Sequence, residues 1–412
     1  MAAHRGMITD RHGEPLAIST PIDSVWANPQ ELLLSRERLP ELAKVLKTDS
    51  DKLQQKLASR RGREFVYLKR HIHPDMAEQV DALGISGVSL QREYRRYYPG
   101  AEVTGHMVGF TNIDDEGQEG IELAFDDWLR GQPGSKRVLK DRIGHIVENV
   151  ESIRVPQPGG SLALSIDRRI QYLAYSELKA AVQKHKARSG SAVVLDIKTG
   201  EVLAMVNQPT FNPNNRSSMR SDHYRNRVVT DVFEPGSTLK PFTVAAALES
   251  GEFNAQSQIQ TAPGFYKVGS STVKDHKNYG LIDVSTVLQK SSNVGASKMA
   301  LALTAEQQWD MLTRVGCGEI TSSGFSGESS GLLTDHRKWR DIDRATLSFG
   351  YGISTTLLQL AQAYGVFATD GYLRPLSLQR IDKAETVIDN QQQVIDKDVA
   401  IQVRKMLERV VQ

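Results

Sequence analysis

Apolar and polar positions follow two different rhythms along this chain of 412 residues, and the change falls near residue 156. Before it, short apolar runs such as EFVYLK (64–69) and EVTGHMVGF (102–110) favour strands. The segment PELAKVLKTDSDKLQQKLA (40–58) has apolar residues at helical spacing on a polar background, which favours helix. The sequence PQPGG (156–160) then interrupts every regular pattern.

After this interruption a new pattern begins with a helix that Asp167 can cap. The sequence SAVVLDIKTGEVLAMV (191–206) predicts a hairpin with a Lys-Thr-Gly turn, and helices joined by glycine-rich loops follow it. We therefore expect a multi-domain α+β protein, with a mixed domain over 1–155 and an α/β, helix-rich domain over 156–412. The apolar stripe of the first helix is predicted to contain Ile170, Leu173, Ala174, Leu178, Ala181 and Val182.

Composition excludes several classes of protein. The formal net charge is only +2, so no global basic field points to nucleic acid. The one cysteine, Cys317, excludes an internal disulfide framework and any cysteine-based metal site. No apolar run approaches the length of a membrane span, and no signal peptide is recognisable.

Ser-x-x-Lys, a pattern typical of serine acyl-transfer enzymes, occurs three times, at Ser176, Ser237 and Ser271. The first pair lies opposite the apolar stripe of its helix, which is typical of a solvated face. The third lies in the polar, turn-rich stretch VGSSTVKDHKNYG, where an exposed strand or loop is expected. Only the pair Ser237 and Lys240 has a context that favours chemistry.

Ser237 and Lys240 lie one turn apart at the start of a helix that is apolar on every side. Pro241 is tolerated in the first turn, and Gly251 can end the helix. An all-apolar helix is buried, and burial lowers the pKa of a lysine. Such a lysine can accept the proton of a neighbouring hydroxyl, and the helix N-terminus offers N–H groups to an oxyanion. The structural alternative is a capping serine beside a lysine that extends to solvent.

A second candidate is Ser291-Ser292-Asn293, located 54 positions after Ser237 between two apolar helical patterns. A turn at a helix junction can present Ser291 as a proton shuttle and Asn293 as an amide that binds a substrate carbonyl. The structural alternative is a pair of capping residues.

The ordered motifs STLK and SSN, with DVFEPGSTLKPF around the first, resemble the penicillin-binding proteins. The segments RGMITDRHGEPLA, EGIELAFDDWLRGQPG, SAVVLDIKTGEVLAMVNQPTFNPNN and SFGYGISTTLLQLAQAYGVFATDG resemble class B members in family order. The sequence is most similar to the division-specific D,D-transpeptidases of Gram-negative bacteria, the penicillin-binding protein 3 type. The resemblance covers nearly the whole chain.

This resemblance implies a membrane-anchored periplasmic enzyme that cross-links peptidoglycan stem peptides from lipid II during septation, without metal or cofactor. It implies an N-terminal pedestal or dimerisation-type domain, β-lactams as inhibitors, and divisome proteins and a glycosyltransferase as partners. Ser237 would be the acylated nucleophile and Lys240 its base, with Ser291 and Asn293 as catalytic partners. Substrate-binding roles would fall to Tyr351 and Ser292.

The chain departs from the family pattern at its third motif, a Lys-Thr-Gly strand expected after the last helix. The only Lys-Thr-Gly, Lys198-Thr199-Gly200, precedes the nucleophile and is explained by turn chemistry. The chain also starts close to a motif and ends inside a helical pattern, so we expect a fragment with impaired activity.

Other sequence patterns are explained by ordinary structure, without a catalytic or metal-binding role. GESSG (327–331) has no strand before it, and His71 and His73 have no third metal ligand nearby. The basic aromatic run REYRRYY (92–98) is typical of a solvated edge, with lipid or partner contact left open. Three functional alternatives remain open: a carboxypeptidase or serine β-lactamase, a non-catalytic division scaffold, and a role in elongation.

Overall fold

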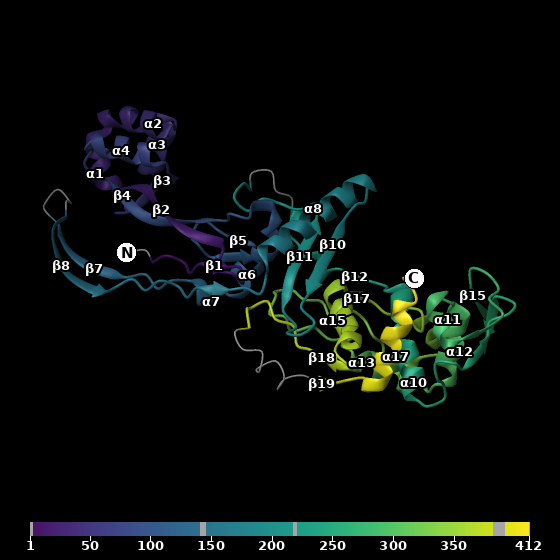
Figure 1. The fold of residues 1–412 in the computed structure, drawn as a ribbon. Helices are drawn as coiled ribbons and strands as arrows, with labels where there is room; N and C mark the ends of the chain where they lie inside the picture. The colour runs from purple at the N-terminus through teal and green to yellow at the C-terminus, as the bar shows by residue number, and fades with distance from the viewer. Residues whose placement is uncertain (1–2, 141–145, 217–220, 382–391, 412) are drawn as a thin grey trace.

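The structure is a computed structural model that describes residues 3–140, 146–216, 221–381 and 392–411. The molecule is elongated (Figure 1). Strands and small helices of the N-terminal part form one end, and a helix-rich C-terminal part forms the other. This mixed architecture confirms the expected multi-domain α+β class.

The N-terminal part is built on β2 (Pro15–Ala27), a strand that pairs with three others. It is antiparallel to β1 (Ile8–Thr9), β3 (Val66–Ile72) and β4 (Val88–Tyr97). Four short helices bury apolar side chains against one end of this sheet and form a separate core with it. These are α1 (Pro29–Leu32), α2 (Leu39–Leu46), α3 (Ser50–Ala58) and α4 (Pro74–Ala82).

The segment 102–110 corrects the strand prediction, because most of it is helical. Residues Ala101–Val103 and Gly105–Val108 (α5) form two short helical turns, and only Phe110–Thr111 (β5) is a strand. Gly109 has φ +77°, and a Cβ there would lie 1.8 Å from the Glu119 carbonyl oxygen. The apolar residues are therefore buried on a tight helical turn rather than on one face of a sheet.

A salt-bridge network joins the N-terminal segment to the rest of this part. Arg5 and Arg96, both almost fully buried, each bond the Glu122 carboxylate, and Arg5 also bonds Asp126. Glu122 lies on α6 (Gly120–Ala124), which is followed by α7 (Asp126–Leu129). After these helices, strands β7 (Ser135–Lys140) and β8 (Ile146–Arg154) form a long hairpin that projects from the molecule (Figure 1).

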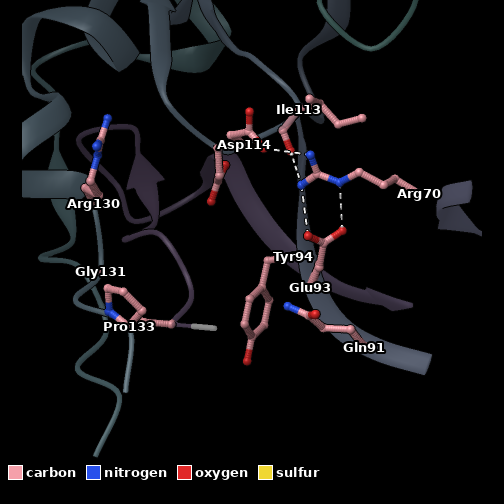
Figure 2. A pocket seen from close by; sticks show the side chains of 11 residues that line it. Arg70, Gln91, Glu93, Tyr94, Ile113, Asp114, Arg130, Gly131 and Pro133 are labelled. Carbon is pink, nitrogen blue, oxygen red and sulfur yellow. Dashed lines mark hydrogen bonds and ion pairs between the residues drawn. The ribbon is translucent and has the colours of Figure 1, made fainter. Parts of the chain in front are cut away.

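A polar groove lies between the β-sheet and the start of this hairpin. Figure 2 shows Arg70 at its edge, with its guanidinium between the carboxylates of Glu93 and Asp114. Tyr94 and Pro133 face each other across the same groove. The charges of Arg70 are thus already satisfied within the protein.

The C-terminal part begins with the predicted hairpin, β10 (Gly190–Leu195) and β11 (Val202–Gln208), covered by α8 (Arg168–Lys184). Asp167 caps α8 as expected, by accepting the backbone N–H of Arg169. The predicted apolar stripe was partly wrong, because Leu173 is 60% exposed. The buried face instead centres on Gln171 and Tyr175.

Polar contacts explain this correction. The Gln171 side chain bonds the backbone of Met205 through both its amide atoms, and the Tyr175 hydroxyl bonds Glu102. A pattern that counts only apolar residues misses buried polar groups whose hydrogen bonds are satisfied.

The helical core surrounds α10 (Lys240–Glu249) (Figure 1). This helix packs against α12 (Asn293–Ala302), α13 (Ala305–Arg314) and α17 (Lys397–Glu408). Two short strand pairs lie beside this core: β13 (Gln258–Gln260) with β16 (Leu281–Asp283), and β14 (Phe265–Val268) with β15 (Ser271–Lys274). In the described part of the chain, no helix is both long and apolar enough to span a bilayer. Further helices are α11 (Val284–Gln289), α14 (Asp341–Leu347) and α15 (Leu357–Ala368).

Candidate active site

The α10 helix holds Lys240 in the protein interior and leaves Ser237 at the surface. Residues Lys240–Leu248 are all buried, as the all-apolar pattern predicted. Ser237 lies on the preceding helical turn, Gly236–Leu239, and is exposed. Gly251, with φ +76°, follows the end of the helix as predicted. The hydroxyl is therefore accessible to a substrate while the lysine is shielded.

The Lys240 amine lies at the centre of a polar cluster inside this apolar helix bundle. Lys240 is 1% exposed, and its Nζ is 2.8 Å from Ser237 Oγ. It is also 2.8 Å from Ser291 Oγ, the Ser291 carbonyl oxygen and Asn293 Oδ1. The structure thus brings together the four residues that the sequence singled out.

The donor count of this cluster is compatible with a neutral amine. The Ser291 carbonyl and Asn293 Oδ1 can only accept hydrogen bonds, whereas the two hydroxyls can donate or accept. A neutral amine gives its two hydrogens to the two obligate acceptors and keeps a lone pair for a hydroxyl proton. Burial lowers the pKa of Lys240 to about 8, although the charge of Asp275 opposes this effect. A base is therefore available near neutral pH.

The Ser291-Ser292-Asn293 motif forms the turn between α11 and α12, as predicted. Ser291 adopts φ +53°, a conformation that directs its carbonyl and its side chain to the same amine. The Asn293 amide nitrogen donates to the Lys274 carbonyl at 3.1 Å, which orients the amide oxygen toward Lys240. Both side chains are thus held in place by the fold.

Asp275 supports this turn, although its polar, turn-rich segment predicted only an exposed strand or loop. One carboxylate oxygen accepts the backbone N–H groups of Asn293 and Val294, at 2.6 and 3.0 Å. The other accepts the Ser292 hydroxyl at 2.6 Å. A carboxylate at a helix N-terminus also interacts favourably with the helix dipole. Asp275 therefore fixes the start of α12 from outside the motif.

Ser292 lies at the start of α12, where its side chain caps the helix. The residue is 0% exposed, and its hydroxyl accepts the Gly295 N–H as well as donating to Asp275. The bond accepted from Gly295 is that of a helix N-cap, and the bond donated to Asp275 fixes the direction of the hydroxyl. These contacts account for the buried hydroxyl, and the substrate contact of Ser292 stays a prediction.

A glycine-rich segment packs against the helical turn Gly236–Leu239, called the nucleophile turn here because it carries Ser237, the predicted nucleophile. The Gly236 N–H donates to the Gly350 carbonyl at 3.1 Å, and the Phe349 ring lies 6.0 Å from Lys240 Nζ. Tyr351 is 52% exposed and contacts Phe349 edge to face. Its ring is thus close in sequence and space to the nucleophile turn and accessible to a ligand.

The other motif matches form ordinary surface elements, as expected. Ser176 bonds the Leu173 carbonyl while Lys179 bonds Glu102, so this pair is not joined. Ser271 to Lys274 form β15 of a hairpin, and residues 327–331 form a loop. Lys198-Thr199-Gly200 forms the β10–β11 turn, and no group of metal-binding side chains occurs among the described residues.

Two family models match this chain. Residues 190–412 match the penicillin binding protein transpeptidase domain, and residues 1–164 match the penicillin-binding protein dimerisation domain. The chain therefore belongs to the penicillin-binding proteins that combine these two domains, which confirms the resemblance read from its motifs.

Individual relatives narrow the comparison. The chain is 46% identical over 387 residues to the peptidoglycan D,D-transpeptidase FtsI of Escherichia coli, covering 93% of this chain and 65% of FtsI. It is 44% identical over 408 residues to the probable peptidoglycan D,D-transpeptidase PbpC of Pseudomonas aeruginosa, covering 99% of this chain and 72% of PbpC. The chain thus spans about two thirds of the length of these relatives.

Solved structures agree with this assignment. Penicillin-binding protein 3 of Mycobacterium tuberculosis, complexed with aztreonam, matches all of this chain and 76% of its own, with a TM-score of 0.74 and 27% identity. The transpeptidase domain of Burkholderia pseudomallei penicillin-binding protein 3 matches 60% of this chain and 70% of its own, with a TM-score of 0.55 and 41% identity.

Proposed function

We propose that this chain is the catalytic part of a serine D,D-transpeptidase that cross-links peptidoglycan stem peptides. The observation that supports it most directly is the buried Lys240 amine, 2.8 Å from the exposed Ser237 hydroxyl. A buried lysine that touches an accessible serine has the geometry of an activated nucleophile.

In the proposed reaction, Ser237 Oγ attacks the carbonyl carbon of the penultimate D-alanine and Lys240 accepts the hydroxyl proton. The Ser237 backbone N–H, at the start of the helix, stabilises the oxyanion. Collapse of this intermediate breaks the peptide bond, and the departing D-alanine amine receives the proton from Lys240 through Ser291. An acceptor amine then attacks the ester, forms the cross-link and returns the proton to Ser237.

Asn293 and Tyr351 are proposed to bind the donor peptide. A hydrogen bond to the Lys274 carbonyl orients the Asn293 side-chain amide, which therefore presents a fixed polar group beside Ser237. The exposed Tyr351 ring can cover an apolar part of the bound peptide. No cofactor is required, because base, shuttle and oxyanion donor all come from the chain.

The test is acylation by a fluorescent penicillin, followed by peptide mass spectrometry. A β-lactam amide would be opened by the same attack, leaving an ester on Ser237. We expect one adduct, on Ser237, and none in Ser237→Ala. An adduct on another residue, or none in a longer chain that carries a Lys-Thr-Gly strand, would refute the proposal.

The rate of this reaction in the 412 residues is expected to be low. Neither Lys-Thr-Gly nor Lys-Ser-Gly occurs between Asn293 and residue 412. The family resemblance implies that such a strand supplies a second oxyanion N–H. A chain that includes such a strand should therefore be acylated faster.

Product analysis separates transpeptidation from the alternatives. A transpeptidase transfers the acyl group to an amine, whereas a carboxypeptidase or β-lactamase transfers it to water. A pentapeptide donor with a D-amino acid acceptor should therefore yield the exchanged peptide. A division scaffold would show neither product, and Ser237→Ala would leave its role unchanged.

We also propose a domain division near residue 155, periplasmic location with a membrane anchor, and a role in septation rather than elongation. The proposed partners are lipid II-derived strands, β-lactams, divisome membrane proteins and a glycosyltransferase. Similarity to FtsI supports these assignments. Localisation of a fluorescent fusion to the division site tests the septal role, and lateral-wall localisation would contradict it.

A further inference from the structure

A small polar cavity lies where the N-terminal part meets the C-terminal part, away from the proposed active site. Its volume is about 200 Å³, enough for a small ion or several water molecules. His71 on β3 and Arg96 on β4 line it from the sheet, and Asp115 lines it from the loop after β5. Arg216, from the segment after β11, completes the wall.

Unpartnered polar atoms concentrate in this cavity. In the described residues, nine buried side-chain nitrogen or oxygen atoms have no hydrogen-bond partner. Two of them, Arg96 Nη2 and Asp115 Oδ1, belong to residues that line this cavity. A third, His71 Nε2, also belongs to a lining residue and has only a long contact of 3.8 Å with the Glu93 carboxylate. Because burying an unpartnered polar group is costly, their clustering points to a guest that bonds several of them at once.

The charges around the cavity favour an anion. Arg96 is only 6% exposed and its other nitrogens bond Glu122 and Ser19, so its remaining N–H groups have a fixed direction. Arg95 and Arg216 also line the cavity, and neither has a carboxylate partner among the described residues. The Arg216 guanidinium is held over the Phe110 ring, 4.9 Å from its centre, and by the Thr111 carbonyl.

Asp115 restricts which anion fits. Burial raises the pKa of Asp115 to about 6, so at pH 7.5 its carboxylate is ionised and accepts hydrogen bonds only. An anion with acceptor oxygens alone would be repelled by Asp115. Hydrogenphosphate instead offers oxygens to the guanidinium groups and one P–OH to the carboxylate.

We propose that this cavity is a binding site for inorganic hydrogenphosphate that joins the two parts of the molecule. The guanidinium groups of Arg96 and Arg216 donate to the phosphate oxygens, and the P–OH donates to Asp115. The neighbouring groove in Figure 2 differs, because the Arg70 guanidinium there is already bonded to Glu93 and Asp114.

Isothermal titration calorimetry of the 412-residue chain at pH 7.5 and constant ionic strength tests this proposal. Phosphate should bind at least tenfold more tightly than sulfate, which has no proton to donate at this pH. Glycerol 3-phosphate should also bind more weakly, because a phosphate monoester is mainly a dianion without a P–OH at pH 7.5. Equal binding of the three ligands, or no binding of phosphate, would overturn the proposal and leave water as the guest.

Three variants identify the site. Arg216→Gln should raise the phosphate Kd about tenfold. Asp115→Asn should remove the preference for phosphate over sulfate, because the amide does not repel sulfate. Arg92→Gln is the matched control on β4, since Arg92 pairs with Asp23 and does not line the cavity. An equal effect of the control, or no effect of Arg216→Gln in a folded protein, would refute the site.

Discussion

The Asp275 carboxylate accepts the backbone N–H of Asn293 at 2.6 Å and thereby fixes the residue that faces Lys240. Asp275 also favours the charged form of Lys240 electrostatically. In Asp275→Asn the bond to Asn293 loses its charge, and a charge-assisted bond contributes about 1.5–3 kcal/mol. We expect the rate of acylation by a β-lactam to fall about tenfold or more, measured by stopped-flow fluorescence.

The pH profile distinguishes this positioning role from general loss of structure. Removing the negative charge lowers the pKa of Lys240 further, so the rise of rate with pH should move to lower pH. Asp335→Asn is a control, because Asp335 pairs with Arg337 near the surface. A lower rate with an unshifted profile would contradict the electrostatic part of this prediction.

The pKa of Lys240, about 8, predicts how acylation depends on pH. Below pH 8 the amine is mostly protonated and cannot accept the Ser237 proton. The acylation rate should therefore rise about tenfold per pH unit up to pH 8 and level off above it. Rates measured with a fluorescent penicillin between pH 6 and 9.5 test this relation.

A lysine replacement separates charge from basicity in the same assay. Lys240→Arg keeps a cation, but a guanidinium remains protonated at every pH tested. It should lose at least about a hundredfold in rate, within the range of general base catalysis, and show no rise with pH. A variant that retained the wild-type profile would mean that another group accepts the proton.

The sequence was sufficient to predict the proposed nucleophile and base because their chemistry is local. Ser237 and Lys240 lie on one helical turn, and the surrounding apolar residues predicted burial of the lysine. The contact of Lys240 with Ser291 and Asn293 spans more than fifty residues, and only the family resemblance suggested it. Asp275 was missed because its role depends on a hairpin that places a loop carboxylate at the start of α12.

The fold predictions failed where burial and polarity do not coincide. Gln171 and Tyr175 are the buried face of α8, because their polar atoms find partners on neighbouring elements. Residues 102–110 are apolar enough for a strand, yet Gly109 requires a tight turn. Both outcomes depend on tertiary neighbours, which a periodicity within one segment does not contain.

Ser292→Ala tests the capping role that the structure gives to this residue. The variant loses the N-cap of α12 and one hydrogen bond to Asp275, so the free energy of unfolding should fall by about 1–2 kcal/mol. Denaturant unfolding measures this change. The β-lactam concentration for half-maximal acylation should change less than twofold.

A different result for Ser292→Ala would indicate that the Ser292 side chain contacts the substrate. In that case the half-maximal concentration would rise while the unfolding free energy stayed unchanged. Ser176→Ala serves as the matched control, because the Ser176 hydroxyl bonds only the backbone of its own helix on an exposed face. It should alter neither quantity.

Gly350 packs directly against the nucleophile turn, so adding one methyl group there should have a large effect on the acylation rate. A Cβ at Gly350 would lie 2.0 Å from the Gly236 carbonyl oxygen, so the turn carrying Ser237 must move. A displaced Ser237 Oγ loses its 2.8 Å contact with Lys240. We expect Gly350→Ala to reduce the acylation rate at least tenfold, because misplacement of about 1 Å has large kinetic costs.

Gly352→Ala is the matched control, because the two glycines have similar positive φ values but only Gly350 lies against Gly236. Their φ values are +86° and +81°, and a Cβ at Gly352 would have no atom within 4 Å. Both variants pay the same conformational strain, about 1–2 kcal/mol, which unfolding experiments should detect in each. Only Gly350→Ala displaces Gly236, so only this variant should show the loss of at least tenfold in acylation rate. Equal rates for the two variants would show that strain, and not the approach of Gly350 to the nucleophile turn, controls the position of Ser237.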